Sequence, residues 1–274
     1  MDSMNRKNSP VTIVTGATAG IGLATADLLK KEGYTVYGTS RRPESDSQNG
    51  IAMLACDVTR DESVASVIAE VIRRSGRIDL LVNNAGFGLI AGAEESSIEQ
   101  AKSVFDVNVF GAMRMTNHAL PVMRQQRNGR VINISSVLGF IPAPYYAIYG
   151  ATKHAIDGYS QTLDHEVRGF GIRVISIEPA ITRTSFDKNL VTPDRPLAIY
   201  DSVRNSVIET SRQQMEKGDE PEVVAQVVLK AAQAAKPRLR YPAGPAARQL
   251  ALMRRIVPEG IFNSILRKQF KLPA

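Results

Sequence analysis

Tyr149 and Lys153 are the residues of this sequence whose types and spacing best suit acid–base chemistry. On a helix, a separation of four residues places both side chains on the same face. An ammonium group beside a phenol stabilises the phenolate and so lowers a phenol pKa that is about 10 when unperturbed. We therefore expect Tyr149 to exchange protons near neutral pH. For this short segment alone, the alternative is an incidental exposed tyrosine and lysine.

Further polar residues stand where an α/β protein binds ligands. Ser135 and Ser136 follow an apolar, strand-like segment at residues 129–134, and open α/β sheets bind ligands at the carboxyl ends of their strands. Asn108 lies among apolar neighbours in a helical pattern that extends to about residue 126. A buried amide must find a hydrogen-bond partner, and most such asparagines are structural. Asn108 is therefore a candidate only in combination with the other residues.

Three glycines, Gly16, Gly20 and Gly22, join an apolar segment directly to a helical pattern that stops at Gly33. Glycines let the backbone approach a ligand closely, and the following helix directs its free N–H groups at the turn, as a pyrophosphate site requires. The spacing Gly-x-x-x-Gly-x-Gly departs from the Gly-x-Gly-x-x-Gly dinucleotide fingerprint, so a plain glycine-rich connection is the alternative. A second strand at residues 35–39 completes a βαβ unit with a right-handed crossover, which favours a cofactor site.

The end of this second strand bears on the choice of cofactor. In dinucleotide-binding folds an acidic residue there bonds the ribose 2′-OH, whereas an arginine accommodates a 2′-phosphate. Here the strand leads into Ser40, Arg41 and Arg42 without a carboxylate, and two guanidiniums can bind a phosphate bidentately. We therefore predict that NADP(H) is preferred over NAD(H). The alternative is that the two arginines begin a solvated loop, which continues in the polar residues 43–50.

Strand-like and helical patterns continue to alternate, which predicts an α/β protein with a parallel sheet. The further strands are expected at residues 51–55, 78–82, 129–134 and 173–178, and helical segments at 64–72, 96–126, from about 149, and at 221–235. Residues 59–62 match a capping box at the start of the first of these helices. Asp57 could bond an adenine amino group or form a local turn. The long polar stretch at 181–218 is either disordered or a lid.

Composition restricts the class of protein. At 274 residues, with 22% charged and 43% hydrophobic residues, the chain fits one globular domain. No apolar run approaches the ~20 residues of a membrane span, and the first residues lack the apolar core of a secretory signal. Cys56 is the one cysteine, which excludes an intrachain disulfide and favours a cytoplasmic location. We expect it to be a buried structural thiol, and we predict no metal site.

The net charge of +7 admits nucleic acid, anionic membranes or phosphorylated ligands as partners. No nucleic-acid-binding motif accompanies the charge, so no nucleic-acid partner is predicted. Basic residues are spread along the chain except for an enriched tail, residues 236–274, which also carries many apolar residues. This tail could dock on a membrane. Prolines and a glycine interrupt it, however, so we expect it to pack over the body of the domain without stable membrane insertion.

Together these residues resemble the motifs of the short-chain dehydrogenase/reductase family over roughly residues 10–235. The matching segments, in order, are Thr15-Gly16-x-x-x-Gly20-x-Gly22, Asn83-Asn84-Ala85-Gly86, Asn108, Ser136 and Tyr149-x-x-x-Lys153. Ser136 matches, rather than Ser135, because it lies 13 residues before Tyr149. The resemblance implies a single-domain Rossmann fold, with a doubly wound parallel β-sheet flanked by helices. Its seventh strand would lie near residues 238–241, and residues 1–235, with the lid at 181–218, would form the core beneath the extension 236–274.

The resemblance also implies a reaction: hydride transfer between a nicotinamide cofactor and an alcohol or its ketone or aldehyde. Tyr149 would be the general acid/base, and the Ser136 hydroxyl would position the substrate oxygen. Lys153 would perturb Tyr149 and bind the nicotinamide ribose. Asn108 would hold a water that links Lys153 to proton donors.

A larger set of residues would contact the cofactor. By resemblance these are Gly16, Thr18, Gly20, Ile21, Gly22, Ser40, Arg41, Arg42, Asp57, Val58, Asn84, Ala85, Gly86, Tyr149, Lys153, Pro179 and Thr184. The sequence departs from the family in two places. Ala180 follows Pro179 where the family commonly has glycine, and Ala19 stands where NADP users commonly have a basic residue. The choice of cofactor is therefore left to Arg41, helped by Arg42.

The strand ending at residues 38–42 and the long tail are similar to the 17β-hydroxysteroid- and retinol-dehydrogenase-like branch, which implies a small hydrophobic alcohol or carbonyl substrate. An alternative is a non-catalytic NADP-binding regulatory protein on the same fold. A sugar-nucleotide epimerase or dehydratase is disfavoured by the glycine spacing and by the shorter chain. The family usually pairs subunits through the helix that carries the tyrosine, so a homodimer or homotetramer is expected.

Overall fold

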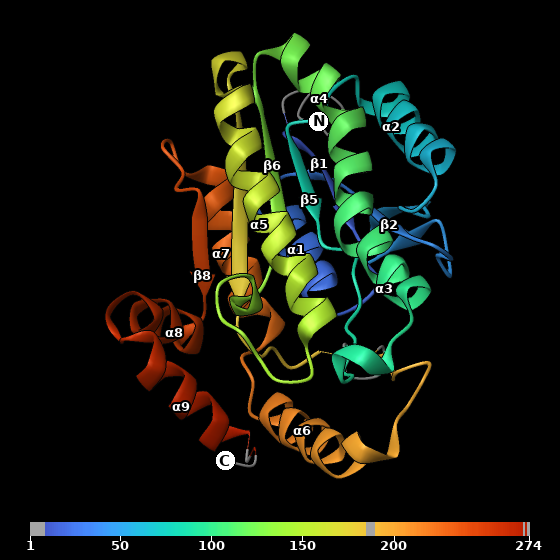
Figure 1. The fold of residues 1–274 in the computed structure, drawn as a ribbon. Coiled ribbons are helices and arrows are strands. Elements are labelled where there is room, and N and C mark those ends of the chain that lie inside the picture. The colour runs from blue at the N-terminus through green and yellow to red at the C-terminus, as the bar shows by residue number, and fades with distance from the viewer. Residues whose placement is uncertain (1–8, 185–189, 271, 273–274) are drawn as a thin grey trace.

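The computed structural model describes residues 9–184, 190–270 and 272, which are built around one mostly parallel sheet (Figure 1). Within this part of the chain the strand order is β3-β4-β2-β1-β5-β6-β7-β8. The strands are β1 (Val11–Thr15), β2 (Thr35–Ser40), β3 (Ser47–Gln48), β4 (Ile51–Ala55), β5 (Leu80–Asn83), β6 (Gly129–Ile134), β7 (Ile172–Pro179) and β8 (Arg240–Ala243). The order reverses at β1, so the doubly wound parallel sheet is confirmed, with every expected strand present.

One strand was not expected. The sequence predicts a loop at residues 43–50, but Ser47 and Gln48 pair antiparallel with β4 at the edge of the sheet. Asn49 and Gly50 form the two-residue turn between the strands, and both have positive φ angles, 52° and 70°. Such a turn suits a hairpin because its twist matches that of the strands. A strand of two residues is too short to leave a periodic pattern in the sequence.

Helices cover both faces of the sheet (Figure 1). One face carries α2 (Asp61–Ser75), α4 (Ala112–Gln126) and α5 (Ala147–Val167), and the other carries α1 (Gly20–Lys31) and α7 (Pro221–Gln233). Each face has its own apolar core, so the central strands are buried on both sides and are predominantly apolar. Cys56 belongs to the first core, and burial raises the pKa of its thiol to about 11, as expected of a structural cysteine.

The helical pattern at 96–126 is confirmed as one continuous region with a change of geometry inside it. It begins with α3 (Ile98–Phe105), whose N-cap Ser97 accepts a hydrogen bond from the Gln100 amide at 3.0 Å. A π-helical turn, Asp106–Gly111, joins α3 to α4. The capping box expected before α2 is wrong, because Arg60 is the N-cap and has no side-chain cap. Thr59 bonds the Asp57 carboxylate instead.

The stretch at 181–218 contains a long helix, α6 (Ala198–Glu216), so the alternative of a disordered connection is wrong for these residues, and the lid stays a prediction. The buried side chains of α6 are Arg204, Val207 and Ser211, which give almost no apolar periodicity. An ion pair holds the helix to the body of the protein: the buried Arg204 guanidinium binds the buried Glu95 carboxylate. Residues 185–189 of the predicted lid lie outside the described residues.

The tail forms β8 and two helices, α8 (Pro245–Ile256) and α9 (Glu259–Gln269). Ala247 and Phe262 are buried in a small apolar cluster together with Val137 and Ile141, which follow β6. The inner faces of both helices therefore pack on the segment next to Ser136. Among the described residues, no helix combines the length and the apolar character that crossing a bilayer requires.

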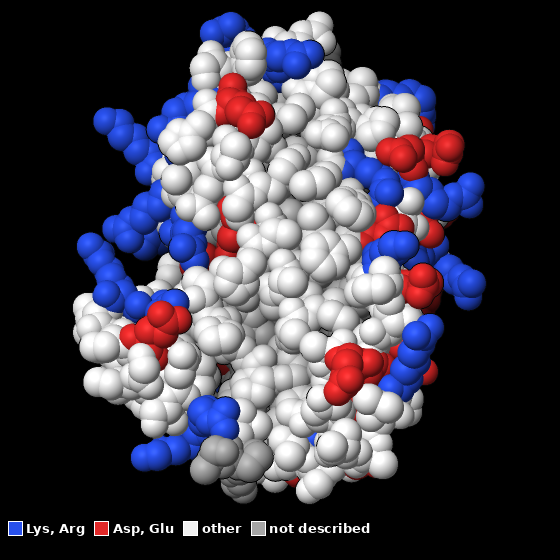
Figure 2. Space-filling view, viewed as in Figure 1, with Lys and Arg blue, Asp and Glu red and all other residues white. Residues whose placement is uncertain are grey.

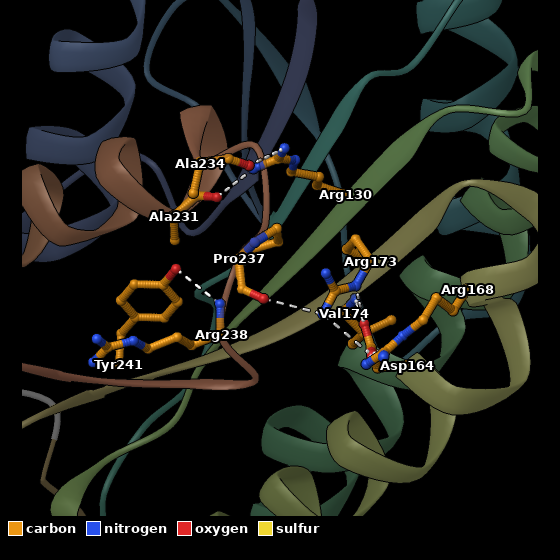
Figure 3. A network of polar contacts seen from close by, with 10 residues as sticks. All are labelled: Arg130, Asp164, Arg168, Arg173, Val174, Ala231, Ala234, Pro237, Arg238 and Tyr241. Carbon is orange, nitrogen blue, oxygen red and sulfur yellow. Dashed lines mark hydrogen bonds and ion pairs between the residues drawn. The ribbon is translucent and has the colours of Figure 1, made fainter.

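A polar network fastens the amino ends of β6 and β7 to their neighbours (Figure 3). The fully buried Asp164 carboxylate of α5 accepts hydrogen bonds from Arg173 Nε at 2.8 Å and from the Val174 amide at 2.9 Å. Arg168 also binds Asp164. Arg173 reaches the Pro237 carbonyl at 3.1 Å, and Arg130 binds carbonyls at the end of α7. This end of the sheet is thereby fixed, while the carboxyl ends of the strands carry the candidate site.

Candidate active site

Tyr149 and Lys153 lie in the first turns of α5, and the side chains of both are buried. The Lys153 ammonium stands 5.5 Å from the centroid of the Tyr149 ring. It also donates a hydrogen bond to the Ile134 carbonyl at 2.9 Å, at the end of β6. Burial lowers the pKa of Lys153 to about 8, although the nearby Asp157 opposes this shift. The predicted pair is therefore formed, and it lies at the carboxyl end of the sheet.

Burial raises the pKa of the Tyr149 phenol, the neighbouring Tyr146 adds to the rise, and a hydrogen bond with Ser136 opposes it. The expectation that Lys153 lowers this pKa is therefore wrong for this structure. The physical reason is placement: the ammonium lies over the ring and is bonded to a backbone carbonyl. Loss of hydration around the phenol then outweighs the charge of the lysine.

The two serines after β6 have different surroundings. The Ser136 hydroxyl hydrogen-bonds Tyr149 and accepts from the Leu138 amide at 3.1 Å, where it caps a 3₁₀ turn, Val137–Gly139. Ser135 is buried, and its hydroxyl donates to the Lys153 carbonyl at 3.4 Å. Ser136 therefore stands beside the phenol, whereas Ser135 supports α5 from behind.

Asn108 sits in the π-helical turn, a geometry that often occurs at functional sites. Its amide accepts from the Phe87 amide at 3.0 Å and donates to the Phe87 carbonyl at 2.9 Å. A longer bond, 3.3 Å, reaches the Thr152 hydroxyl next to Lys153. Asn108 thus joins the loop after β5 to the helix that carries Tyr149. Its role in holding a water stays a prediction.

The glycine turn has the shape of a phosphate cradle. Gly16 and Gly20 have φ angles of 65° and 54°, which other residues adopt at a cost. A Cβ atom on Gly22 would lie 2.1 Å from the Gly16 carbonyl oxygen, so no side chain fits there. Asn84 donates to the Gly16 carbonyl at 3.1 Å, and the Thr184 side chain lies against Gly20. The turn therefore brings together residues predicted to bind a cofactor from three separate segments.

A cavity of about 290 Å³ extends from this turn towards the end of β2. Its lining includes Thr18 and Arg42, together with Glu44 and Gln48 of the β3 hairpin. Near the end of β2, the Ser40 hydroxyl oxygen is buried and finds no hydrogen-bond partner among the described residues. A glycine cradle, an arginine in the cavity wall and an unpaired hydroxyl fit a phosphate-bearing adenosine group.

Other predicted cofactor residues are less directly engaged. Asp57 accepts from the Thr59 amide at 3.0 Å and from its hydroxyl at 2.7 Å, so it makes the local turn that was its alternative role. These bonds lower the pKa of Asp57, and Arg41 adds to the effect. Val58 packs against Gly111. The remaining residues lie in the loop after β5, at the end of β7 and in α1; they are Ala85, Gly86, Pro179 and Ile21.

Sequence reasoning missed a buried acidic pair behind the site. Asp157 lies one helical turn after Lys153 and contacts Gly139, where an added Cβ atom would come within 2.1 Å of its Oδ2. Glu178, inside β7, pairs with Arg240 of the tail. Burial and the charge of Asp157 raise the pKa of Glu178 to about 7, against the opposing effect of Arg240. Two signals could have revealed the pair: an acid four residues after Lys153 and an acid in an apolar strand.

Comparison with known proteins identifies the family. A family model described as short chain dehydrogenase matches residues 10–195, which is more than half of the chain. The chain belongs to the short-chain dehydrogenase family. Among curated relatives, YusZ of Bacillus subtilis, an uncharacterized oxidoreductase, is 32% identical over 278 residues, covering 96% of this chain and 99% of the relative. A 3-ketodihydrosphingosine reductase of Bacteroides thetaiotaomicron is 40% identical over 179 residues, covering 65% of this chain and 66% of the relative.

Solved structures agree with this placement. A short-chain dehydrogenase from Streptomyces avermitilis has a TM-score of 0.80 and 30% identity, and the match covers 96% of each chain. ElxO with NADP bound has a TM-score of 0.71 and 27% identity over 85% of this chain and 94% of that one. This short-chain dehydrogenase is thus an oxidoreductase that acts on CH–OH or carbonyl groups of small substrates with a nicotinamide cofactor. The resemblance to the hydroxysteroid- and retinol-dehydrogenase-like branch stays a prediction.

Proposed function

We propose that this short-chain dehydrogenase interconverts a hydrophobic primary or secondary alcohol and its aldehyde or ketone with NADP(H), and that Tyr149 is its general acid/base. The observation that carries the proposal is the group of buried Tyr149, buried Lys153 and half-buried Ser136 at the carboxyl end of β6. A phenol bonded to a serine hydroxyl beside an ammonium group suits proton transfer to or from a substrate oxygen. No observation favours the non-catalytic alternative.

Each residue of the site has its own role in the reaction. The nicotinamide cofactor supplies or accepts the hydride at the substrate carbon. During reduction, Tyr149 gives its proton to the carbonyl oxygen, which the Ser136 hydroxyl holds in place. The raised pKa of Tyr149 keeps this proton on the phenol at neutral pH. Lys153 binds the ribose and keeps a positive charge beside the ring, while Asn108 fixes the start of α5 through Thr152.

NADP(H) preference rests on charge at the end of β2. Arg42 lines the 290 Å³ cavity beside the glycine turn, and Arg41 precedes it on the same segment. Guanidiniums bind a 2′-phosphate through paired hydrogen bonds, whereas NAD(H) has no such group to offer. That ElxO was solved with NADP bound is consistent with this preference. Glu44 lines the same cavity and its carboxylate repels a phosphate, so the preference requires the two guanidiniums to outweigh it.

An apolar substrate is supported by the segment that follows Ser136. Val137 and Ile141 are buried in an apolar cluster with the tail, and Leu138 and Phe140 pack against the same cluster. The relative named 3-ketodihydrosphingosine reductase reduces, according to its name, a ketone on a long-chain base. A substrate of this kind, with one carbonyl on an aliphatic chain, agrees with the apolar residues that follow Ser136.

A homodimer or homotetramer is part of the proposal. On α5, Ala151 and Gly158 are exposed on the side away from the sheet, and nothing packs within 4 Å of the position of a Cβ atom at Gly158. Small residues on a helix face let a second helix approach closely. We expect α5 to meet its counterpart in another subunit there.

The test is consumption of NADPH and of NADH by the full chain with aliphatic, steroid, retinoid and quinone carbonyls, and with polar sugars as controls. The proposal predicts NADPH-dependent turnover of at least one apolar carbonyl and a clear preference for NADPH over NADH. Equal use of the two cofactors would contradict the NADP(H) assignment. Turnover of the sugars alone, or tight NADPH binding without turnover of any carbonyl, would contradict the substrate class or the catalytic role.

A further inference from the structure

The positive charge of this protein is concentrated in its tail. Nine of the 34 Lys and Arg residues lie after residue 235, but only one of the 27 Asp and Glu residues does. The last 39 residues therefore carry a net charge of +8, and the preceding 235 carry −1. A charge so segregated is expected where one part of a protein meets an anionic partner.

The same segment exposes large aliphatic side chains on the outer faces of its two helices. On α8, Leu252 and Ile256 are 58% and 66% exposed, and on α9, Ile261 and Ile265 are 57% and 43% exposed. A spacing of four residues places the members of each pair on one helix face. Ala247 of α8 and Phe262 of α9 are instead buried against the body of the protein. Each helix thus leaves one aliphatic pair that the described residues do not cover, opposite the buried side of α8 and beside the buried Phe262 on α9.

Cations are interleaved with these aliphatic residues. Arg248 and Arg255 are exposed on α8, four residues before Leu252 and one before Ile256, and Lys268 is exposed on α9, three residues after Ile265. On the lobe that α8 and α9 form, Figure 2 shows Lys and Arg side chains that border uncharged surface. A small acidic area lies on the same lobe. Arg254 differs, because its guanidinium stacks over the Phe262 ring at 5.7 Å. The outer face is consequently both apolar and basic.

We propose that the outer faces of α8 and α9 are a docking surface for an anionic phospholipid bilayer. Aliphatic side chains with flanking Lys and Arg allow a helix to lie in the headgroup region, where apolar burial and attraction to anionic lipids act together. The cores of protein interfaces, by contrast, are enriched in aromatic residues, and the exposed large side chains of this face are Leu and Ile. Docking of this kind is reversible and needs no membrane-spanning helix.

The docking surface is carried by the same two helices that pack next to the candidate site. The inner faces of α8 and α9 contact Val137 and Ile141, directly after Ser136, so the docked face and the candidate site share the tail between them. A bilayer on the outer face would thus be separated from the apolar residues after Ser136 by α8 and α9 alone. The docking proposal itself stands on the charge and exposure of the tail, and it holds or fails independently of the proposed reaction.

The experiment is flotation of the full chain with vesicles of phosphatidylcholine alone or of phosphatidylcholine with phosphatidylglycerol. We expect the wild type to float with the anionic vesicles, to stay behind with the neutral ones, and to detach at high salt. Leu252→Ser/Ile256→Ser removes two outer-face residues, and Arg248→Gln/Arg255→Gln removes two charges. Each double variant is expected to bind at least about tenfold more weakly.

The matched control is Ile98→Ser/Ile199→Ser, which removes two residues of 66% and 84% exposure outside the tail and is expected to leave vesicle binding unchanged. Thermal unfolding of every variant checks that the fold is retained. Because the charge variant leaves all apolar side chains in place, it tests the proposal even if the serine variant fails to fold. Wild type that stays behind with anionic vesicles would overturn the proposal. Equal losses of vesicle binding in the tail and control variants would also overturn the proposal. So would the finding that the outer faces of α8 and α9 join copies of this chain and do not contact the vesicle.

Discussion

At the scale of single residues, burial decides the protonation of the candidate site. Tyr149 and Lys153 lie together as their spacing predicts, yet burial moves both pKa values towards the neutral forms of these groups. The phenol thus keeps its proton at neutral pH, and the pKa of the Lys153 ammonium lies close to neutral pH. Both states suit a reductase that must deliver a proton while holding a positive charge nearby.

The first prediction concerns the charge on Lys153. Burial lowers its pKa to about 8, so the ammonium form predominates below this pH and is lost as the pH rises above it. Because the ammonium is expected to bind the cofactor, NADPH affinity should fall above about pH 8 in the wild type. Fluorescence titrations on either side of pH 8 measure this. The Lys153→Met variant should bind more weakly below pH 8 and show no such break; a break that persists in the variant would assign it to another group.

The second prediction concerns the arginines after β2. Each charged hydrogen bond to a phosphate contributes about 1.5–3 kcal/mol, so Arg41→Ala/Arg42→Ala should weaken NADPH binding by about 10–100-fold or more. NADH binding should change little, since NADH has no 2′-phosphate. Lys31→Ala removes an exposed cation of α1 and serves as the control. An equal loss for both cofactors would mean that the arginines only maintain the fold of this loop.

The sequence predicts much of the site at this scale, because hydrogen-bonding residues at strand ends converge in any parallel sheet. Asn84, Ser136 and Tyr149 all come to the carboxyl edge for that reason. The direction of the Tyr149 pKa shift could not be predicted, since it depends on how much of the phenol is covered. Asp157 and Glu178 were missed because their pairing needs α5, β7 and the tail to be in place.

At the scale of elements, α5 organises the molecule. Its first turns carry Tyr149 and Lys153, and its last turn carries Asp164, which binds the start of β7. One helix thereby connects the candidate site at the carboxyl ends of the strands with the polar network at their amino ends (Figure 3). The orientation of the catalytic candidates therefore depends on contacts at the far end of the same helix.

The third prediction follows from this network. Although burial alone raises the pKa of Asp164, its hydrogen bonds to Arg173, Arg168 and the Val174 amide outweigh burial and lower it. Replacing Asp164 with Asn removes the buried charge and leaves Arg173 without its ionic partner, which should reduce the free energy of unfolding by about 3–5 kcal/mol at neutral pH. Urea unfolding measures this loss.

A control variant and a series of pH values show whether the loss comes from the buried charge. Asp61→Asn, at an ion-paired residue that is 70% exposed, should cost less than about 1 kcal/mol. The lowered pKa of Asp164 means that its ionised contribution is present above the ordinary carboxyl pKa and is lost as the pH falls through the folded-state value. The difference between wild type and Asp164→Asn should therefore shrink in acid. A difference that is constant with pH would show that packing, and not charge, is lost.

Elements differ in how well the sequence predicts them, and the reason is burial. The central strands of this sheet are covered on both faces, so they are predominantly apolar segments that stand out. By contrast, α6 is docked by the buried ion pair of Arg204 and Glu95 and by a short apolar stripe, so it leaves a weaker periodic pattern. The two-residue β3 is defined by its partner strand and turn alone.

At the scale of the whole molecule, the two ends of the sheet have different tasks. The amino ends are fastened by buried ion pairs and carbonyl contacts, whereas the carboxyl ends carry the glycine turn, Asn108, Ser136 and α5. The tail adds β8 to the sheet and covers the segment after Ser136, so chain far from the motifs packs next to the candidate site (Figure 1). Its packing on the body of the domain is a contact that the apolar residues of the tail predicted.

The measurement that tests the central claim most directly is turnover by Tyr149→Phe with NADPH and the best apolar carbonyl, with NADPH binding measured in parallel. We expect kcat to fall at least ~10²-fold, as for loss of a general acid, while the variant still binds NADPH. Tyr146→Phe is the matched control: its ring lies 6.2 Å from that of Tyr149 and its hydroxyl bonds Ser211, so its turnover should stay within a few-fold of wild type. A Tyr149→Phe variant that keeps wild-type turnover would contradict the assignment of Tyr149 as the proton donor.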